Sequence, residues 1–257
     1  MTRKIAYILI AVGLLFLAVS IITPSLTALA VTGSILLTTG MVLVSLGVFK
    51  MGLSFFSDNL CRLPDPGNRV ALTFDDGPHP ETERLLDILT KYNVKATFFC
   101  IGKEAEKYPE TLKRIISSGH TVGSHTYSHS WKYLFSSDSK VASEIDLGGE
   151  TIAGISGKKP VFFRPPFGIT TPTVARAIRT NHLKCIGWNI RTFDTMTTNG
   201  NRIFTKVKKQ LKPGAIILLH DRLETTVNIL PQILDEIKKQ GFSPVSLEEA
   251  LNHKMHV

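Results

Sequence analysis

The chain has 257 residues, 43% of them hydrophobic, and carries a formal net charge of +9 at pH 7. That length allows one large domain with additional segments. The odd number of cysteines, three, and their wide spacing exclude a disulfide framework, and the sequence contains no nucleic-acid-binding motif, so we expect no nucleic-acid partner.

Two long uncharged runs occupy the first 50 residues. Ile5–Ile22 contains no charged residue, and after Thr23-Pro24-Ser25 a second uncharged run extends over Leu26–Phe49. Each run is about long enough to span the ~30 Å hydrocarbon core of a bilayer as a helix. We therefore predict a transmembrane hairpin over residues 1–50 that binds the lipid bilayer. The alternative is a pair of buried core helices.

Small residues recur every seven positions in both runs, which keeps each set close to one helix face. Such faces let transmembrane helices approach each other closely, although runs this rich in small residues can contain the repeat by chance. The first set is Ala6, Gly13 and Ser20, and the second is Gly33, Gly40 and Gly47.

The charges that flank the runs predict an orientation. Arg3 and Lys4 precede the first run, Lys50 and Arg62 follow the second, and the connection between the runs is uncharged. Because positive residues favour the cytoplasmic side, we expect a two-pass protein of the cell (inner) membrane with its soluble part in the cytoplasm. Ala28-Leu-Ala30 resembles a signal-peptidase site, and a single effective crossing would instead place the soluble part outside the cytoplasm.

Residues 51–257 carry 27 of the 30 Lys and Arg residues and all 21 Asp and Glu residues, a net charge of +6. Beside a membrane, a basic surface is typical of attraction to anionic headgroups or acidic substrates; the alternative is a basic surface that only contacts solvent. We expect a linker over residues 51–67, which contains the turn signal Pro64-Asp-Pro-Gly67, and one domain over residues 68–257.

Strand and helix patterns alternate through this domain. Repeated strand–helix units predict an α/β fold with a parallel sheet covered by helices, and about seven strands favour closure into a barrel. The expected strands are Val70–Phe74, Ala96–Ile101, Thr121–Ser124, Val161–Arg164, Leu183–Ile190 and Ala215–His220, with a weaker one near Ser243–Val245. The expected helices are Glu81–Tyr92, Glu104–Ser118, Ser139–Ile155, Thr173–Asn181, Arg202–Leu211 and Thr226–Gln240.

Polar side chains end or follow four of the expected strands. The carboxyl ends of parallel strands meet at one rim of a barrel, and active sites of this architecture lie there. We therefore expect residues that are far apart in sequence to converge on one site. They are Asp75-Asp76, His125, Arg164 and His220.

Asp76 and the pair in His125-Thr-Tyr-Ser-His129 offer one carboxylate and two imidazoles. Three such ligands, with a position left open for water, are typical of a catalytic metal site. They suit zinc, with cobalt, nickel or iron as alternatives, and a bound divalent cation lowers the pKa of its water to about 7. Two histidines at this spacing are common by themselves, and the adjacent Asp-Asp strand end is what favours a metal site.

The remaining polar residues suggest acid–base chemistry. Asp75 is the candidate general base, with capping of the following turn as its alternative role. His220 is the candidate general acid because its pKa range suits protonation of a leaving amine, although most histidines at such positions are structural. Asp194 is preferred to Asp221 as the partner of His220, since adjacent strand residues face opposite ways. Arg164 would hold Asp75 ionised or form a surface salt bridge.

Four ordered motifs are therefore present: Thr73-Phe-Asp-Asp-Gly-Pro78, His125-Thr-Tyr-Ser-His129, Arg164-Pro-Pro-Phe-Gly168 and Leu218-Leu-His220. Together they resemble the motifs of the polysaccharide deacetylases with a NodB homology domain (carbohydrate esterase family 4). The resemblance covers roughly residues 68–250. It implies a distorted (β/α) barrel and metal-dependent hydrolysis of an acetamido group on an amino sugar.

The resemblance also implies a role for each matching residue. Asp75 would be the base, steadied by Arg164, and His220 the acid, paired with Asp194. The metal ligands would be Asp76, His125 and His129. Substrate binding would involve Pro166, Phe167, Gly168, Trp188 and Leu218, of which Leu218 lines the acetyl pocket and the backbone near Phe167 helps to hold the oxyanion.

One motif departs from the family pattern. The family usually has an Asp-x-x-Asp-Trp-like segment before the last catalytic strand, whereas this chain reads Trp188-Asn-Ile-Arg191-Thr-Phe-Asp194-Thr195. Arg191 replaces the first aspartate and Thr195 replaces the tryptophan. The wall of the pocket is therefore altered, which puts a long-chain chitin or peptidoglycan substrate in doubt.

The sequence predicts a membrane-anchored hydrolase of linear amides, an N-deacetylase whose partner is an acetylated amino sugar. Outside the cytoplasm the substrate would be a cell-wall or surface polysaccharide or glycan precursor. At the cytoplasmic face a lipid-linked amino sugar, deacetylated or deformylated, would be the better candidate. The alternatives are a non-catalytic sugar- or lipid-binding member of the fold and a metal-dependent amidase that acts on a non-sugar amide.

Overall fold

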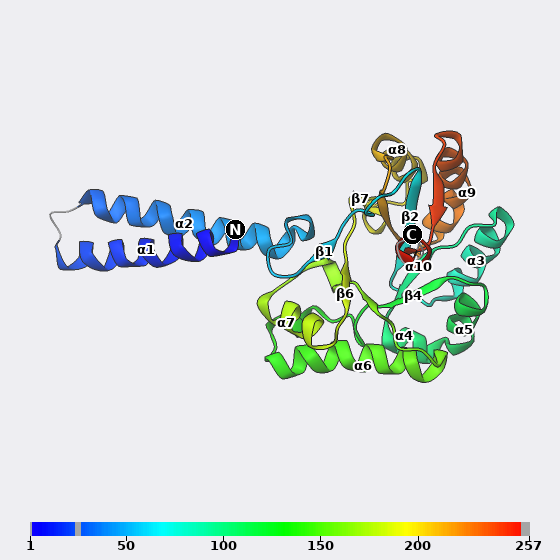
Figure 1. Ribbon diagram of the computed structural model, residues 1–257, viewed down its shortest axis with the longest axis horizontal. Helices are drawn as coiled ribbons and strands as arrows, with labels where there is room; N and C mark the ends of the chain where they lie inside the picture. The colour runs from blue at the N-terminus through cyan, green and yellow to red at the C-terminus, as the bar shows by residue number, and fades with distance from the viewer. Residues whose placement is uncertain (1, 24–26, 253–257) are drawn as a thin grey trace.

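The computed structural model describes residues 2–23 and 27–252. Figure 1 shows two parts, a pair of long helices at the N-terminal end and an α/β domain from whose side the pair projects. Pro24, Ser25 and Leu26, over which the expected turn and the start of the second run fall, lie outside the described residues, as does the C-terminal end of the expected domain.

The two uncharged runs form helices α1 (Thr2–Ile22) and α2 (Thr27–Phe49). Both are long and apolar enough to cross a membrane. Only a small share of either helix is buried within the protein, which argues against the alternative of buried core helices. A signal sequence near the N-terminus would have the same length and composition.

Of the small residues noted in the sequence, Ala6, Gly13, Gly33 and Gly40 lie where the two helices meet, whereas Gly47 faces Phe55. A Cβ atom added at Gly13 would lie 2.8 Å from the backbone oxygen of Gly33, and one added at Gly40 would lie 2.9 Å from that of Ala6. Real side-chain atoms do not approach backbone this closely, so the absence of a side chain at Gly13 and Gly40 is what permits this helix spacing. The expected close approach of the two helices is therefore present in the structure.

A larger side chain at Gly40 should separate the two helices. In Gly40→Leu, a Cβ would meet Ile10 Cγ1 at 2.6 Å, and overpacking of this kind costs about 1–3 kcal/mol. We expect the free energy of unfolding in detergent to fall by that amount. Ala18→Leu, at an exposed position of α1, is the control and should leave it unchanged; equal effects of the two substitutions would show that the hairpin is not packed at Gly40.

The segment expected as a linker is instead part of the domain. It contains the short 3₁₀ helix η1 (Met51–Leu53) and strand β1 (Asn59–Leu60), which pairs in parallel with β6. Phe55 is buried against Gly47 of α2, and the backbone N–H of Thr170 donates to the carbonyl of Val48 at 3.1 Å. These contacts join the base of the hairpin directly to the domain. The sequence pattern did not predict these contacts, because turn residues dominate the segment of residues 51–67.

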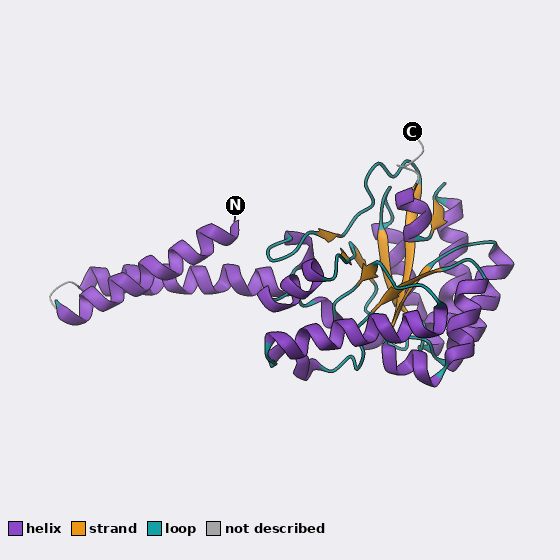
Figure 2. Ribbon diagram, turned by 60° about the horizontal axis from the view of Figure 1, so that its bottom comes forward, coloured by secondary structure: helices purple, strands orange, loops and turns teal. Residues whose placement is uncertain are grey.

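The domain is built on one parallel sheet whose strand order is β1-β6-β5-β4-β3-β2-β8-β7, with β9 paired to the first half of β2. Figure 2 shows the strands gathered at the centre with helices around them. Among the described strands β1 and β7 end the order, so the barrel is curled and open rather than closed. The strands are β2 (Arg69–Asp75), β3 (Thr97–Cys100), β4 (Thr121–Ser124), β5 (Phe162–Phe163), β6 (Lys184–Ile186), β7 (Ile190–Arg191), β8 (Ile216–His220) and β9 (Ser243–Val245).

The helices follow the sequence pattern with two exceptions. Pro109 lacks a backbone N–H and begins a new helix, so the single helix expected over Glu104–Ser118 is two. A further helix, α10, lies beyond the last strand and was not expected. The helices are α3 (Pro80–Tyr92), α4 (Gly102–Lys107), α5 (Pro109–Ser117), α6 (Asp138–Ser156), α7 (Pro172–Thr180), α8 (Gly200–Gln210), α9 (Glu224–Lys239) and α10 (Leu247–Asn252), with short 3₁₀ helices η2 (Trp131–Phe135), η3 (Pro166–Gly168) and η4 (Asp194–Met196).

The register of the sheet aligns the carboxyl ends of the strands that carry the candidate site residues. Asp75 at the end of β2 stands opposite His220 of β8, and Ser124 of β4 stands opposite Phe163 of β5. The residues that follow Ser124 and Phe163 are His125 and Arg164. Parallel pairing therefore delivers all four expected strand ends to one rim, as the sequence predicted.

Candidate active site

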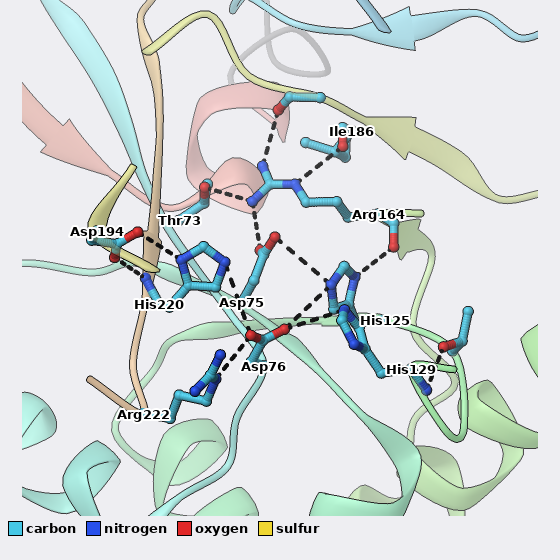
Figure 3. Close-up of polar contacts among 12 residues, drawn as sticks. Thr73, Asp75, Asp76, His125, His129, Arg164, Ile186, Asp194, His220 and Arg222 are labelled. Atoms are coloured by element: carbon cyan, nitrogen blue, oxygen red, sulfur yellow. Dashed lines mark hydrogen bonds and ion pairs between the residues drawn. The ribbon is translucent and has the colours of Figure 1, made fainter. Parts of the chain in front are cut away.

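The side chains at this rim line a cavity of about 230 Å³. Its residues come from the end of β2, the β4–α6 connection, η3, the β6–β7 connection, β7, η4, β8 and the β8–α9 connection. Figure 3 shows how the polar members point toward one another. The lining residues are Asp75, Asp76, His125, His129, Phe167, Gly168, Trp188, Arg191, Thr195, Leu218, His220 and Arg222.

Asp75 is held by a fully buried arginine. Arg164 donates from Nη1 to Asp75 Oδ1 at 2.6 Å and to Thr73 Oγ1 at 2.9 Å. Its other nitrogens are occupied as well, with Nε donating to the carbonyl of Ile186 and Nη2 to that of Gly187. A guanidinium with every nitrogen bonded cannot swing away, so the Asp75 carboxylate is fixed beside a permanent positive charge. The alternative of a surface salt bridge for Arg164 is therefore wrong.

Asp76 lies just beyond the strand, where its φ of 76° turns the chain. Its Oδ2 accepts a hydrogen bond from Arg222 Nε at 3.0 Å, while its buried Oδ1 has no hydrogen-bond partner among the described residues. Oδ1 lies 3.6 Å from His125 Nε2 and 3.4 Å from His129 Nε2. A buried carboxylate oxygen without a hydrogen-bond partner that faces two imidazole nitrogens has the surroundings of a metal ligand.

These three side chains fit a metal ion. One ligand atom from each of Asp76, His125 and His129 lies within 4.8 Å of the others. Tetrahedral bonds of about 2.0–2.2 Å place ligand atoms about 3.3–3.6 Å apart, close to the separations found for Oδ1. Burial raises the pKa of Asp76, but the neighbouring imidazoles and the bond from Arg222 outweigh burial and lower it overall. The carboxylate is therefore charged, as a ligand must be.

Both imidazoles are oriented as ligands. His125 Nδ1 lies 2.7 Å from the carbonyl oxygen of Arg164, so Nδ1 carries the proton and Nε2 presents its lone pair to the cluster. His129 adopts φ 52°, and its backbone N–H donates to Thr126 Oγ1 at 3.2 Å. Burial and the adjacent His125 lower the pKa of His129 to about 4, so its ring is neutral at physiological pH.

His220 is paired with Asp194, as expected, and not with Asp221. His220 Nδ1 donates to Asp194 Oδ1 at 2.8 Å, and the backbone N–H of His220 donates to Asp194 Oδ2 at 2.8 Å. Thr226 Oγ1 donates to the same carboxylate. Burial alone would lower the pKa of His220, but Asp194 raises it to about 9, so the ring is protonated at neutral pH.

Asp221 points away from the cavity, although it follows His220 directly. Its Oδ2 accepts from Thr82 Oγ1 at 2.7 Å, and the carboxylate packs on Gly77, where an added Cβ would lie 1.9 Å from Oδ2. Burial raises the pKa of Asp221 to about 7. The alternation of side chains along a strand thus separates two neighbouring residues into different environments.

The expected substrate-binding residues divide into two groups. Phe167, Trp188 and Leu218 line the cavity, and so does Gly168, whose φ of 70° and contact with the Trp188 ring leave no space for a side chain. Pro166 is buried and is not among the lining residues.

Arg222 lies at the site although no sequence pattern predicted it there. It lies two residues after His220, and in Figure 3 its guanidinium approaches Asp76 from the side away from His125 and His129. The ion pair joins residues 146 positions apart in the sequence, so no local sequence pattern predicts it. Thr195 and Arg191, noted in the sequence only as departures, also line the cavity.

The comparisons with known proteins agree with this geometry. The family model described as polysaccharide deacetylase matches residues 62–186. A peptidoglycan-N-acetylglucosamine deacetylase of Bacillus cereus is 36% identical over 183 residues, which are 69% of this chain and 66% of that protein. The chain spans 40 to 66% of the length of the first four curated relatives.

Solved structures share the fold. The Bc1960 peptidoglycan N-acetylglucosamine deacetylase, in complex with a hydroxamate-type compound, superimposes with a TM-score of 0.71 at 32% identity, covering 75% of this chain and 92% of that one. A mutant of a CE4 family pseudoenzyme of Bacillus anthracis, with restored enzymatic activity, has a TM-score of 0.70 at 27% identity, covering 77% and 73%. Inactive proteins thus share this architecture, so activity must be argued from the residues of the site.

Proposed function

This chain belongs to the polysaccharide deacetylase family, and we propose that it is a membrane-anchored, metal-dependent enzyme that removes the N-acetyl group from an amino sugar of a glycan or glycan precursor. One observation carries the proposal: a clamped carboxylate, a three-ligand cluster and a protonated histidine line a single cavity. This set supports catalysis over the alternative of a non-catalytic sugar-binding protein, because binding alone requires neither a base nor an acid.

Asp76, His125 and His129 would hold the metal. When bound there, a divalent cation supplies Lewis acidity to the acetyl carbonyl and lowers the pKa of water to about 7. Imidazole and carboxylate ligands favour zinc, with cobalt, nickel or iron as the alternatives.

Residues of the protein carry out the two proton transfers of the reaction. Water attacks the carbonyl carbon of the acetamido group while Asp75, held in place by Arg164, accepts a proton from it. His220, kept protonated by Asp194, then donates its Nε2 proton to the sugar nitrogen as the C–N bond breaks. The products are acetate and a free amino sugar. Trp188, Leu218 and the backbone at Phe167 would enclose the acetyl group.

Membrane attachment defines two candidate substrates. The named peptidoglycan deacetylases among the relatives favour an acetylated cell-wall polymer, which lies outside the cytoplasm. The positive charges at both ends of the hairpin, Arg3 and Lys4 before α1 and Lys50 after α2, favour a cytoplasmic domain and therefore a lipid-linked amino-sugar precursor.

Two measurements test this proposal. Purified full-length protein in detergent, loaded with zinc, should release acetate from N-acetylglucosamine oligomers or peptidoglycan fragments, and a reporter fused to the C-terminus should assign the side of the membrane. Metal binding without acetate release from any acetamido sugar would contradict the assignment as an enzyme and favour the sugar-binding alternative. Release from non-sugar acetamides alone would favour the amidase alternative.

The proposed role of Asp194 predicts a change in pH dependence. His220 must be protonated to act as the acid, so kcat/KM of the wild type should hold up to about pH 9 and fall above it. In Asp194→Asn the counter-charge that chiefly opposes burial is lost, so the pKa of His220 falls and the alkaline limb should move to lower pH. Loss of activity with an unmoved alkaline limb would show that Asp194 does not act through His220.

A further inference from the structure

The exposed charges around the mouth of the catalytic cavity are all positive. Among its lining residues, the exposed ones are Phe167, Arg191, Thr195 and Arg222. The two lining carboxylates, Asp75 and Asp76, are buried and already bonded to arginines. A ligand that enters therefore meets two exposed guanidinium groups and no exposed carboxylate among the lining residues.

Arg191 is positioned without a counter-ion. Its guanidinium lies 4.9 Å from the centre of the Phe193 ring and 5.8 Å from that of Trp188. The structure gives it no ion pair with any carboxylate of the described residues. Cation–π contacts with these two rings hold the guanidinium beside the cavity, and its N–H groups are not occupied by a carboxylate of the described residues. An exposed arginine held in this way is available to bind an anion.

Arg222 has spare donors at the same cavity. Only its Nε is occupied, by Asp76 Oδ2 at 3.0 Å, and neither Nη atom has a hydrogen bond within the described part of the chain. Its side chain is 44% exposed. Arg222 is thus anchored at one nitrogen while its two Nη atoms keep their donors, which suits bidentate contact with a carboxylate or phosphate.

The positive surface continues beyond the cavity. Next to Phe193 lies a groove of about 740 Å³ whose charged lining residues in the described structure are Arg202, Lys206 and Lys209 of α8. Lys206 Nζ lies 5.4 Å from the centre of the Phe193 ring, on which Arg191 also packs. The segment that contributes Arg191 to the cavity therefore also borders a basic groove. The cavity and the groove thus contribute to one region of positive electrostatic potential.

We propose that the cavity selects an acetamido sugar that bears a negative charge, a phosphate ester or a carboxylate, close to the reacting residue, and that Arg191 and Arg222 bind that charge. The inference rests on the proposed deacetylase function and narrows its substrate class. Arg191 is a specificity residue, because it places a positive charge where the family usually has an aspartate. Its planar guanidinium can pair with either a phosphate or a carboxylate, so it selects substrates by charge.

The test compares a neutral sugar oligomer with versions of it that carry an anionic group. Full-length zinc-loaded protein in detergent is given an N-acetylglucosamine tetramer with and without a 1-phosphate, and the same tetramer with N-acetylmuramic acid in alternate positions. We expect kcat/KM to be about tenfold or more higher for a charged member, the size of one charge-assisted hydrogen bond. The phosphate and carboxylate arms show which oxyanion is preferred. In Arg191→Gln that preference should fall by about tenfold, and in Arg191→Glu it should reverse.

Arg179→Gln, which removes an exposed arginine at the end of α7, is the matched control and should keep the preference. Equal turnover of neutral and charged tetramers by the wild type would overturn the inference while leaving the deacetylase proposal intact. Equal loss of preference in the Arg191 and Arg179 variants would overturn the assignment to Arg191. Absence of acetate from every tetramer would instead contradict the deacetylase proposal itself.

Discussion

Replacement of Asp75 by asparagine is expected to abolish turnover while metal binding is retained. A positioned general base contributes about 100- to 10,000-fold to a rate, and the amide of asparagine cannot accept the proton. The metal ligands are untouched by the change, because Asp75 is assigned to proton transfer and Asp76 to the metal. We would measure acetate release together with the metal content of the gel-filtered protein.

The asparagine variant also tests the fold around Arg164. Its amide oxygen can still accept from Arg164 Nη1, but the buried guanidinium loses its counter-charge, and removal of one partner from a buried pair costs about 3–5 kcal/mol at most sites. Asp221→Asn is the matched control, since Asp221 is a buried carboxylate of the same rim that does not line the cavity; it should keep turnover. Near-normal turnover in Asp75→Asn would show that another group is the base.

Replacement of His125 by alanine is expected to remove both metal and activity. His125 is buried, its Nδ1 is fixed by the carbonyl of Arg164, and its Nε2 faces Asp76 Oδ1. Loss of a group that merely orients a metal ligand costs about 10- to 100-fold in affinity, so loss of the ligand itself should exceed about 100-fold. Metal analysis after gel filtration should fall from stoichiometric to background.

His182→Asn provides the control for the histidine variant. His182 is exposed at the end of α7 and adopts φ 53°, a conformation that asparagine tolerates. It should bind metal and release acetate as the wild type does. Full metal content in His125→Ala would mean that the cluster of Asp76, His125 and His129 is not the metal site.

Much of the fold was predictable because the local patterns agree with the tertiary structure. The buried strand at Val70–Phe74 ends where its pattern ends, and the polar residues after four strands meet at one rim because parallel pairing brings carboxyl ends together. Family membership follows from the same motifs. The preference for Asp194 over Asp221 as the partner of His220 was correct because strand alternation is a local rule.

The rest depends on contacts that no local pattern contains. The run Leu183–Ile190 divides into β6 and β7 because residues 187–189 lie outside both strands, and β1 lies in a segment dominated by turn residues. The bond from Arg222 to Asp76 depends on how two loops meet. Closure of the barrel was expected from the number of strand–helix units, but a count of units carries no information about whether the edge strands pair.

Metal removal and replacement tests the central claim most directly. Full-length protein in detergent is stripped with a chelator, dialysed, and assayed for acetate release from an acetylated amino-sugar oligomer before and after one equivalent of zinc is returned. The proposed mechanism predicts that release ceases in the stripped protein and returns with zinc, in the wild type but not in His125→Ala. Undiminished acetate release from protein shown to be free of metal would contradict it.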